Sequence, residues 1–272
     1  MAARSIGYLV LCAVLAWSCS KDPDPDNSSN ESYAIRSITY NGKTHNRFIY
    51  NAAGKITEYQ SFYFYYRYTY NEKGILIKEE SAFADEMNPS DPGGKNELLT
   101  AQNSVFTGYS LYLYEHDSLL KQKIYYHKNN GKYELVSKSS FEYVNGNIVK
   151  WNIHTANDTI TQYYTYEYDN NRNVIMQKQY SYLSGNGHEP VLVRETTYTY
   201  DDKHNPFIIF RQTASPGVFT NTNNVIETRS TLFVETAGIP KYTQSTSSYE
   251  YNLAGYPRKA GTGSSAYVYI YY

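Results

Sequence analysis

A tyrosine motif recurs along this chain and constrains its fold more than any other feature. The motif reads Tyr-x-Tyr, then Asn or Asp, then a short turn, then an aliphatic residue or Pro. Because alternate residues of a strand share a face, the two rings line one side while the residue between them faces the other. Aromatic rings suit such a pleated, half-buried surface. Copies are Phe48–Ile56 (with Phe in the first ring position), Tyr68–Leu76, Tyr166–Val174, Tyr198–Pro206 and Tyr249–Pro257.

The turn of the motif predicts a β-hairpin. Asn or Asp tolerates turn geometry and bonds its own backbone, and a Gly near the end of the turn supplies a positive φ. Gly54, Gly74 and Gly255 hold that position, whereas two copies carry Arg172 and His204 there. Either the left-handed conformation is not restricted to Gly in this motif, or the turn differs in those two copies.

Repetition of the motif predicts an all-β fold, an antiparallel β-hairpin meander curled into a barrel or barrel-like sheet of roughly 14 to 16 strands. No segment has helical periodicity long enough to predict a helix. The chain ends in Ala266–Tyr272, which carries apolar or aromatic side chains on both faces of a strand. An unpaired strand of this kind is an aggregation hazard, so we expect it to pair with the strand near Ile35–Tyr40.

The N-terminus resembles a bacterial lipoprotein signal. An apolar run from Ile6 to Trp17 ends in Ala16-Trp17-Ser18-Cys19, which matches the lipobox positions except for the bulk of Trp17. The resemblance implies a signal peptide over 1–18 and a lipid on Cys19 that holds the protein at the outer membrane. A plain secretory leader cleaved elsewhere is the alternative. Cys12 would leave with the leader, so no disulfide is expected.

Three segments follow from this assignment: the signal peptide, an acidic tether over 19–33 that its composition predicts to be disordered, and a single β-domain over 34–272. The acidic cluster beside Cys19 resembles the export signal of surface lipoproteins in Bacteroidetes, which implies display on the cell surface. Anchoring that faces the periplasm is the alternative. The faces opposite the tyrosines carry charges such as Glu167, Lys178 and Arg194, which favours a tethered soluble barrel over one that spans the membrane.

The motif is similar to the YD (rearrangement-hotspot) repeats of large secreted bacterial shells. In a chain with a lipobox and a tether, the pattern more closely resembles an uncharacterised family of Bacteroidetes lipoproteins with a porin-like β-barrel fold. The resemblance covers the chain from about Ser37 onward. It implies a fold and a compartment, and it brings no catalytic residues with it.

The sequence shows no pattern typical of an enzyme, a metal site or a cofactor site. The six histidines have no pair at i, i+2 or i, i+4 spacing, and no nucleophile elbow, zinc-protease motif or phosphate loop occurs. Nearly balanced charge, with 25 basic and 26 acidic residues, argues against a nucleic-acid partner. We therefore expect no catalytic residues, no metal, no cofactor and no nucleic-acid binding.

The 33 tyrosines favour a binding function, because rings exposed at the end of a barrel can stack on sugar faces. Our leading hypothesis is a non-catalytic binding or scaffold protein on the cell surface, with a glycan as ligand. The alternative is that the tyrosines are purely structural. Two other functions stay open: an interaction module of a larger outer-membrane complex, or an enzyme that acts on polysaccharide. Trp151 is the candidate ligand-binding residue, with core packing as the alternative, and the loop over 83–97 is either a binding lid or disordered.

Overall fold

A computed structural model describes residues 33–84, 97–115, 119–183, 189–212, 216–217, 220–233, 239–261 and 266–272. They belong to one unit of the chain, Ser32–Tyr272, and form one 17-stranded antiparallel sheet with a short 3-10 helix, η1. The predicted all-β antiparallel meander is confirmed. The elements are β1 (Ile35–Tyr40), β2 (Lys43–Tyr50), β3 (Ile56–Ser61), β4 (Phe64–Tyr70), β5 (Leu76–Phe83), β6 (Gly108–Glu115), β7 (Leu119–Asn129), β8 (Lys132–Val144), β9 (Asn147–Thr155), β10 (Ile160–Tyr168), β11 (Val174–Tyr182), β12 (Pro190–His204), η1 (Pro206–Gln212), β13 (Asn223–Leu232), β14 (Lys241–Thr246), β15 (Tyr249–Tyr251), β16 (Pro257–Ala260) and β17 (Tyr267–Tyr271).

Strand pairing runs in chain order and brings the two ends of the described chain together. Each strand from β1 to β13 pairs with the next, and β15, β16 and β17 continue the sheet on the other side of β1. β17 lies antiparallel to β1, with Tyr267 opposite Tyr40 and Tyr271 opposite Ile35. The predicted pairing of the last strand with the first is therefore confirmed.

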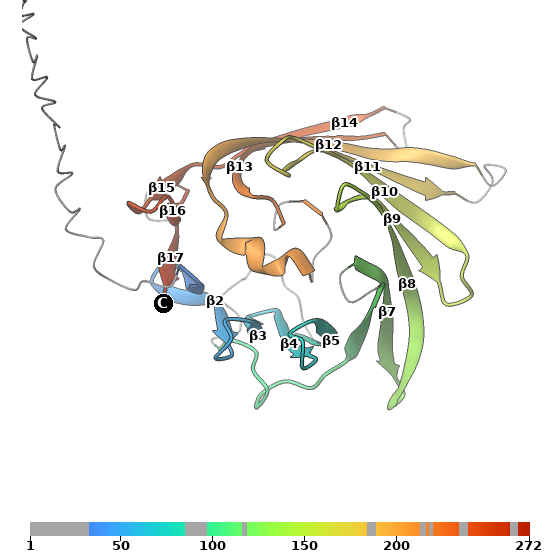
Figure 1. Ribbon diagram of the computed structural model, residues 1–272, viewed down its shortest axis with the longest axis horizontal. Helices are drawn as coiled ribbons and strands as arrows, with labels where there is room; N and C mark the ends of the chain where they lie inside the picture. Colours follow the sequence, from blue (N-terminus) through green and yellow to red (C-terminus); the bar gives the residue numbers. More distant parts are fainter. Residues whose placement is uncertain are drawn as a thin grey trace, which may run out of the picture. The chain divides into compact units, whose positions relative to one another are not determined.

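The sheet curls back on itself without closing, and η1 lies within the curve (Figure 1). Within the described residues no pairing joins β14 to β15, which are separated only by Ser247 and Ser248. The amide of Ser247 donates to Ile226 O, and Ser248 O accepts from the amide of Gly261, both at 2.9 Å. At these two serines the chain thus passes from pairing with β13 to pairing with β16. This division of one segment into two strands is one reason why the strand count exceeds the predicted range.

The motif turns are built as the sequence predicts. In the turn after β2, Asn51 Oδ1 accepts from the amides of Ala53 and Lys55, each at 3.0 Å, and Gly54 has a φ of 71°. Arg172 takes the same left-handed conformation with a φ of 66°, so the motif does not require Gly there. His204 behaves differently, because it stays in β12 opposite Asn223. The two alternatives left open by the sequence each apply to one copy.

The second tyrosine of most motif copies links its repeat to the preceding one. Its hydroxyl donates to a backbone carbonyl near the start of the preceding strand, so neighbouring strands are joined by these side chains as well as by strand pairing. A buried phenol needs such a partner, and the carbonyl provides one without a second side chain. The pairs, at 2.5 to 2.8 Å, are Tyr50 to Ile35, Tyr70 to Ile56, Tyr143 to Leu120, Tyr168 to Ile148, Tyr200 to Val174 and Tyr271 to Pro257.

The outer face of the sheet carries cross-strand ion pairs. Lys178 Nζ lies 3.7 Å from Glu195 Oε2, and Lys150 Nζ lies 3.2 Å from Glu142 Oε1. Arg194 does not belong to this face, so its assignment from the sequence was wrong. It stands four residues from Tyr198 on the same strand, and period-two alternation puts both side chains on one face.

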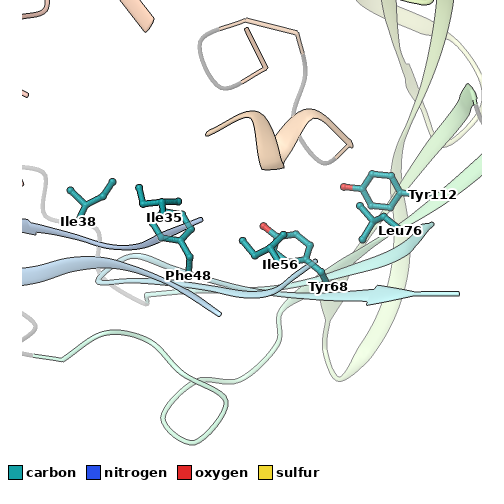
Figure 2. Close-up of a cluster of buried hydrophobic side chains, with 7 residues drawn as sticks. All are labelled: Ile35, Ile38, Phe48, Ile56, Tyr68, Leu76 and Tyr112. Carbon is teal, nitrogen blue, oxygen red and sulfur yellow. The ribbon is translucent and has the colours of Figure 1, made fainter. Parts of the chain in front are cut away.

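The main hydrophobic core lies between the inner face of β1–β6 and η1. Figure 2 shows its buried members on the side of these strands that faces η1. Phe207, Ile209 and Phe210 of η1 pack against them, together with Tyr269 and Tyr271 of β17. The buried members are Ile35, Ile38, Phe48, Ile56, Tyr68, Leu76 and Tyr112.

Candidate functional site

The motif tyrosines line the inside of the curled sheet. Directly opposed residues of antiparallel strands share a face, and the pairings Phe48–Tyr59, Tyr59–Tyr66 and Tyr68–Glu79 carry one face from β2 to β5. The pairing of Tyr112 with Lys123 continues that face from β6 to β7. Two charged side chains therefore stand among the inner rings, where the sequence indicated only aromatic ones.

The motif copy at Tyr198–Pro206 departs from the pattern and supplies η1. After His204 the chain does not return as a strand but turns inward at Pro206, the first residue of η1. Asn205 caps this helix, because its Oδ1 accepts from the amide of Phe207 at 3.0 Å. Its Nδ2 donates to Asn221 O at 2.8 Å. The Pro at the helix start and the preceding Asn suit this role, although the sequence pattern predicted another hairpin.

A cluster of buried asparagines, which the sequence analysis missed, holds the segment that follows η1. Asn173 is only 1% exposed, and its Oδ1 accepts from the amides of Thr222 and Asn223 at 2.9 and 3.0 Å. Its Nδ2 donates to Asn223 Oδ1 at 2.9 Å, and Asn221 Oδ1 accepts from the amide of Val174 at 2.8 Å. Buried side-chain amides need hydrogen-bond partners of this kind. The run from Asn221 to Asn224 was the signal available in the sequence.

A cavity of about 410 Å³ lies between η1 and the inner face of the sheet. Phe210 packs edge-on to Tyr59, with ring centroids 5.9 Å apart, and lies equally close to Phe48. A predominantly aromatic hollow with a few polar groups is typical of a small-molecule site. The lining residues are Ile38, Asn46, Phe48, Tyr59, Tyr66, Tyr68, Glu79, Lys123, Phe207 and Phe210.

The polar side of this cavity is an ion pair supported by a phenol. Lys123 Nζ lies 3.4 Å from Glu79 Oε1, and the Tyr112 hydroxyl donates to Glu79 Oε2 at 3.1 Å. The side chains of Glu79 and Lys123 are 12% and 26% exposed, so both charges are largely withdrawn from water. Lys123 Nζ also lies over the Tyr112 ring, 5.0 Å from its centroid. Asn46 Nδ2 donates to the Tyr59 hydroxyl at 2.6 Å.

The phenols around the cavity stay protonated at neutral pH. Burial raises the pKa of Tyr68 and of Tyr112 well above the usual value, and the negative charge of Glu79 raises both further. Burial likewise raises the pKa of Tyr59 and Tyr66. The cavity therefore presents aromatic faces, hydroxyl donors, one carboxylate and one ammonium. That set can bind hydroxyl-bearing ligands.

Trp151, the residue singled out from the sequence, lies on the inner face of β9 and does not line this cavity. Its ring stacks between those of Phe141 and Tyr164, with ring centroids 6.3 and 5.0 Å apart, and the residue is half-buried. This ladder of rings places Trp151 within the wall of the curled sheet. Cys19 and the loop residues 85–96 lie outside the described residues, as do the signal peptide and most of the tether.

Glu79 and Lys123 were missed because they carry no motif. They sit 44 residues apart, on β5 and β7, and only the strand register shows that they face each other. Within the described ranges, no group of three His, Cys, Asp or Glu side chains is placed to hold a metal ion. In the same ranges, no helix has both the length and the apolar character needed to cross a bilayer.

No known protein family matches the chain, and no curated protein matches it. Among solved structures, a porin-like protein from Bacteroides vulgatus is similar with a TM-score of 0.50 and 9% identity, over 88% of this chain and 98% of that one. A porin-like protein from Bacteroides uniformis has a TM-score of 0.44 and 11% identity, over 89% and 99%. A Bacteroides fragilis protein of unknown function has a TM-score of 0.34 and 17% identity, over 48% and 89%. The likeness to the Bacteroides vulgatus protein shows a shared fold.

Proposed function

We propose that this protein binds a small saccharide, without catalysis, in the cavity between η1 and strands β2–β7. The observation that carries the proposal is the combination of aromatic walls with the Glu79–Lys123 pair in one hollow of about 410 Å³. Sugar rings have an apolar face that packs on aromatic rings and an edge of hydroxyls that bonds to polar groups. Phe48, Phe207 and Phe210 supply the first kind of contact.

The polar contacts come from groups that keep bonding capacity. The Tyr59 hydroxyl accepts from Asn46 and has its own proton to donate, and Lys123 has three N–H donors. A ligand of this size and polarity would be enclosed on the η1 side by Phe207 and Phe210. Trp151 is not part of this site, so the proposal moves ligand binding from the residue expected from the sequence to the cavity.

The test is a glycan array probed with the full chain in a detergent that has no sugar headgroup. We expect signals that Phe210→Ala and Tyr59→Ala weaken about tenfold or more, because each removes a ring wall. Tyr163→Ala is the matched control, since Tyr163 stacks on Tyr180 outside the cavity. Absence of any signal above background for the unmodified chain would refute the proposal.

We propose further that Cys19 carries a lipid that holds the protein at the outer membrane, with the β-domain on the cell surface. The described chain starts beside a motif turn, where Tyr33 stacks on Tyr256 with centroids 4.7 Å apart. The last residue lies close by, because the Tyr272 amide donates to Ala34 O at 3.1 Å. The start of β1 and the end of β17 therefore lie side by side.

Cell fractionation tests the anchor, and protease treatment of intact cells tests the location. Cys19→Ser should release the protein from the membrane fraction, and external protease should digest the β-domain of the unmodified protein. Retention of the Cys19→Ser protein in the membrane would contradict the lipid anchor. Full protection from protease would favour the periplasmic face.

Two other functions are separated from saccharide binding by simple observations. A two-carboxylate glycosidase needs a second acid facing the first, and Glu79 is the one carboxylate among the described lining residues. If the protein nevertheless hydrolysed a bound glycan, it would be an enzyme, and the proposal of binding without catalysis would be wrong. Recovery of the protein in a stable envelope complex, with no glycan signal, would favour an interaction module.

A further inference from the structure

The cavity that we propose as the saccharide site has no net charge. Glu79 and Lys123 are the charged residues among those that line it within the described chain, and they face each other at 3.4 Å. Each charge is compensated by the other. Glu79 is also bonded to Tyr112, and the Lys123 ammonium lies over the Tyr112 ring.

A charged group on a ligand would find no unpaired charge of opposite sign among the described residues that line this cavity. Burying an unpaired ion costs far more than burying a neutral polar group, and separating an existing pair leaves one ion without compensation. A carboxylate on the ligand would have to compete with Glu79 for Lys123. An ammonium on the ligand would have to compete with Lys123 for Glu79.

We infer that the Glu79–Lys123 pair makes the cavity selective for neutral sugars over uronic acids and amino sugars. This inference rests on the proposed saccharide binding. It assigns Glu79 and Lys123 a shared role in specificity: their hydrogen bonds go to ligand hydroxyls, and their mutual neutralisation excludes charged ligands.

The experiment compares three charge forms of the same sugar ring by calorimetry on the full chain. The probes are glucose, glucuronate and glucosamine, and the corresponding galactose and mannose sets. For the unmodified protein we expect the neutral member of at least one set to bind about tenfold or more tightly than both charged members, which is the scale of an uncompensated charge interaction.

Single substitutions should change this preference in opposite directions. Glu79→Gln leaves the ammonium of Lys123 unpaired, so the uronate should become the preferred member of its set. Lys123→Met leaves the carboxylate of Glu79 unpaired, so the amino sugar should become preferred. The double variant E79Q/K123M has no charge to compensate, and it should return to a preference for the neutral sugar.

A matched control is available on the outer face. Glu142→Gln breaks the Lys150–Glu142 pair, which lies 3.2 Å apart on the outside of β8 and β9, and should leave every preference unchanged. If a single variant fails to fold by circular dichroism, the double variant still tests the inference, because a preference for a charged member in that variant would contradict it.

The two proposals fail in different ways. No binding of any sugar by the unmodified protein would refute saccharide binding itself. Binding of the neutral sugar, with charged members bound equally well or with no change of preference in Glu79→Gln, would refute the role of the ion pair and leave saccharide binding in place.

Discussion

The inner face of the sheet differs between β1–β5 and β8–β9, although the same tyrosine motif built both regions. In β1–β5 the inner face holds Ile38, Phe48 and Tyr68, each less than 10% exposed, against the rings of η1. In β8 and β9 the buried inner residue is Ser139, because Asn152, which is also buried, lies on the outer face with Lys150, and no hydrophobic side chain of these strands is fully buried. One region has a core, and the other has a polar wall with stacked rings.

The motif by itself therefore does not require that other parts of the protein cover the inner face of its strands. Strand pairing and bonds from tyrosine hydroxyls to carbonyls recur in both regions: Tyr70 bonds to Ile56 in one, and Tyr143 to Leu120 in the other. Burial of apolar surface is concentrated where η1 lies. The proposed site falls at the boundary, where the core gives way to polar inner residues.

The largest expected effect comes from deleting residues 266–272, which removes β17 from between β1 and β16. The deletion opens two strand edges and uncovers the partners of Tyr269 and Tyr271 in the core. We expect no cooperative thermal transition by circular dichroism. Val268→Thr keeps the strand and should melt close to the unmodified protein. A truncated protein that melts at the original temperature would show that the β1 region does not depend on β17.

Truncating one ring in each region tests the difference in core packing. Phe48→Ala should lower the free energy of unfolding by about 3–5 kcal/mol, because Phe48 is 1% exposed and nothing refills its space. Phe141→Ala in β8 should cost about 1–2 kcal/mol, because that ring is only half-buried and mainly stacks on Trp151. Urea titrations followed by circular dichroism measure both. Equal losses would abolish the distinction between the regions.

Alkaline pH should reveal what the two regions share. Burial raises the pKa of Tyr70 and of Tyr143 to about 12 in the folded protein, against 10.0 as the usual value. The unfolded chain therefore ionises first, so this contribution to stability is complete below pH 10 and is lost as pH rises from 10 to 12. In Tyr70→Phe and in Tyr143→Phe, the free energy of unfolding should fall less steeply with pH, and by a similar amount in both. Urea titrations across this pH range measure the change. An effect confined to one variant would show that the bonds from tyrosine hydroxyls to carbonyls also differ between the two regions.

The smallest effect concerns the motif turns. Gly54→Ala should cost about 1 kcal/mol, because an L-residue is strained at a φ of 71°. Arg172→Gly should instead raise stability by about 0.5 kcal/mol, since relief of the strain at a φ of 66° exceeds the entropy cost of Gly. Thermal denaturation of both variants checks these signs. Destabilisation by Arg172→Gly would mean that the Arg172 side chain stabilises its turn.

The sequence determined the repeated architecture of this protein because the signals involved are local. Period-two spacing sets the inner rings, Asn51 and Gly54 build a turn within a few residues, and the two-faced apolar end of the chain requires a partner strand. Asn-Gly pairs such as Asn145-Gly146 also gave tight turns with positive φ, at 52° and 77°. Each of these features follows from neighbours in the chain and needs no knowledge of distant segments.

The tertiary structure alone decided what fills the curve of the sheet. Pro206 leads into η1 where the motif predicted a hairpin, and Asn173 holds that insertion through Asn223, which is 50 residues away. The pairing of Glu79 with Lys123 depends on the register of β5, β6 and β7. Contacts of this kind arise from which strands become neighbours and in which register, and that choice is made by the free energy of the whole sheet rather than by any one segment.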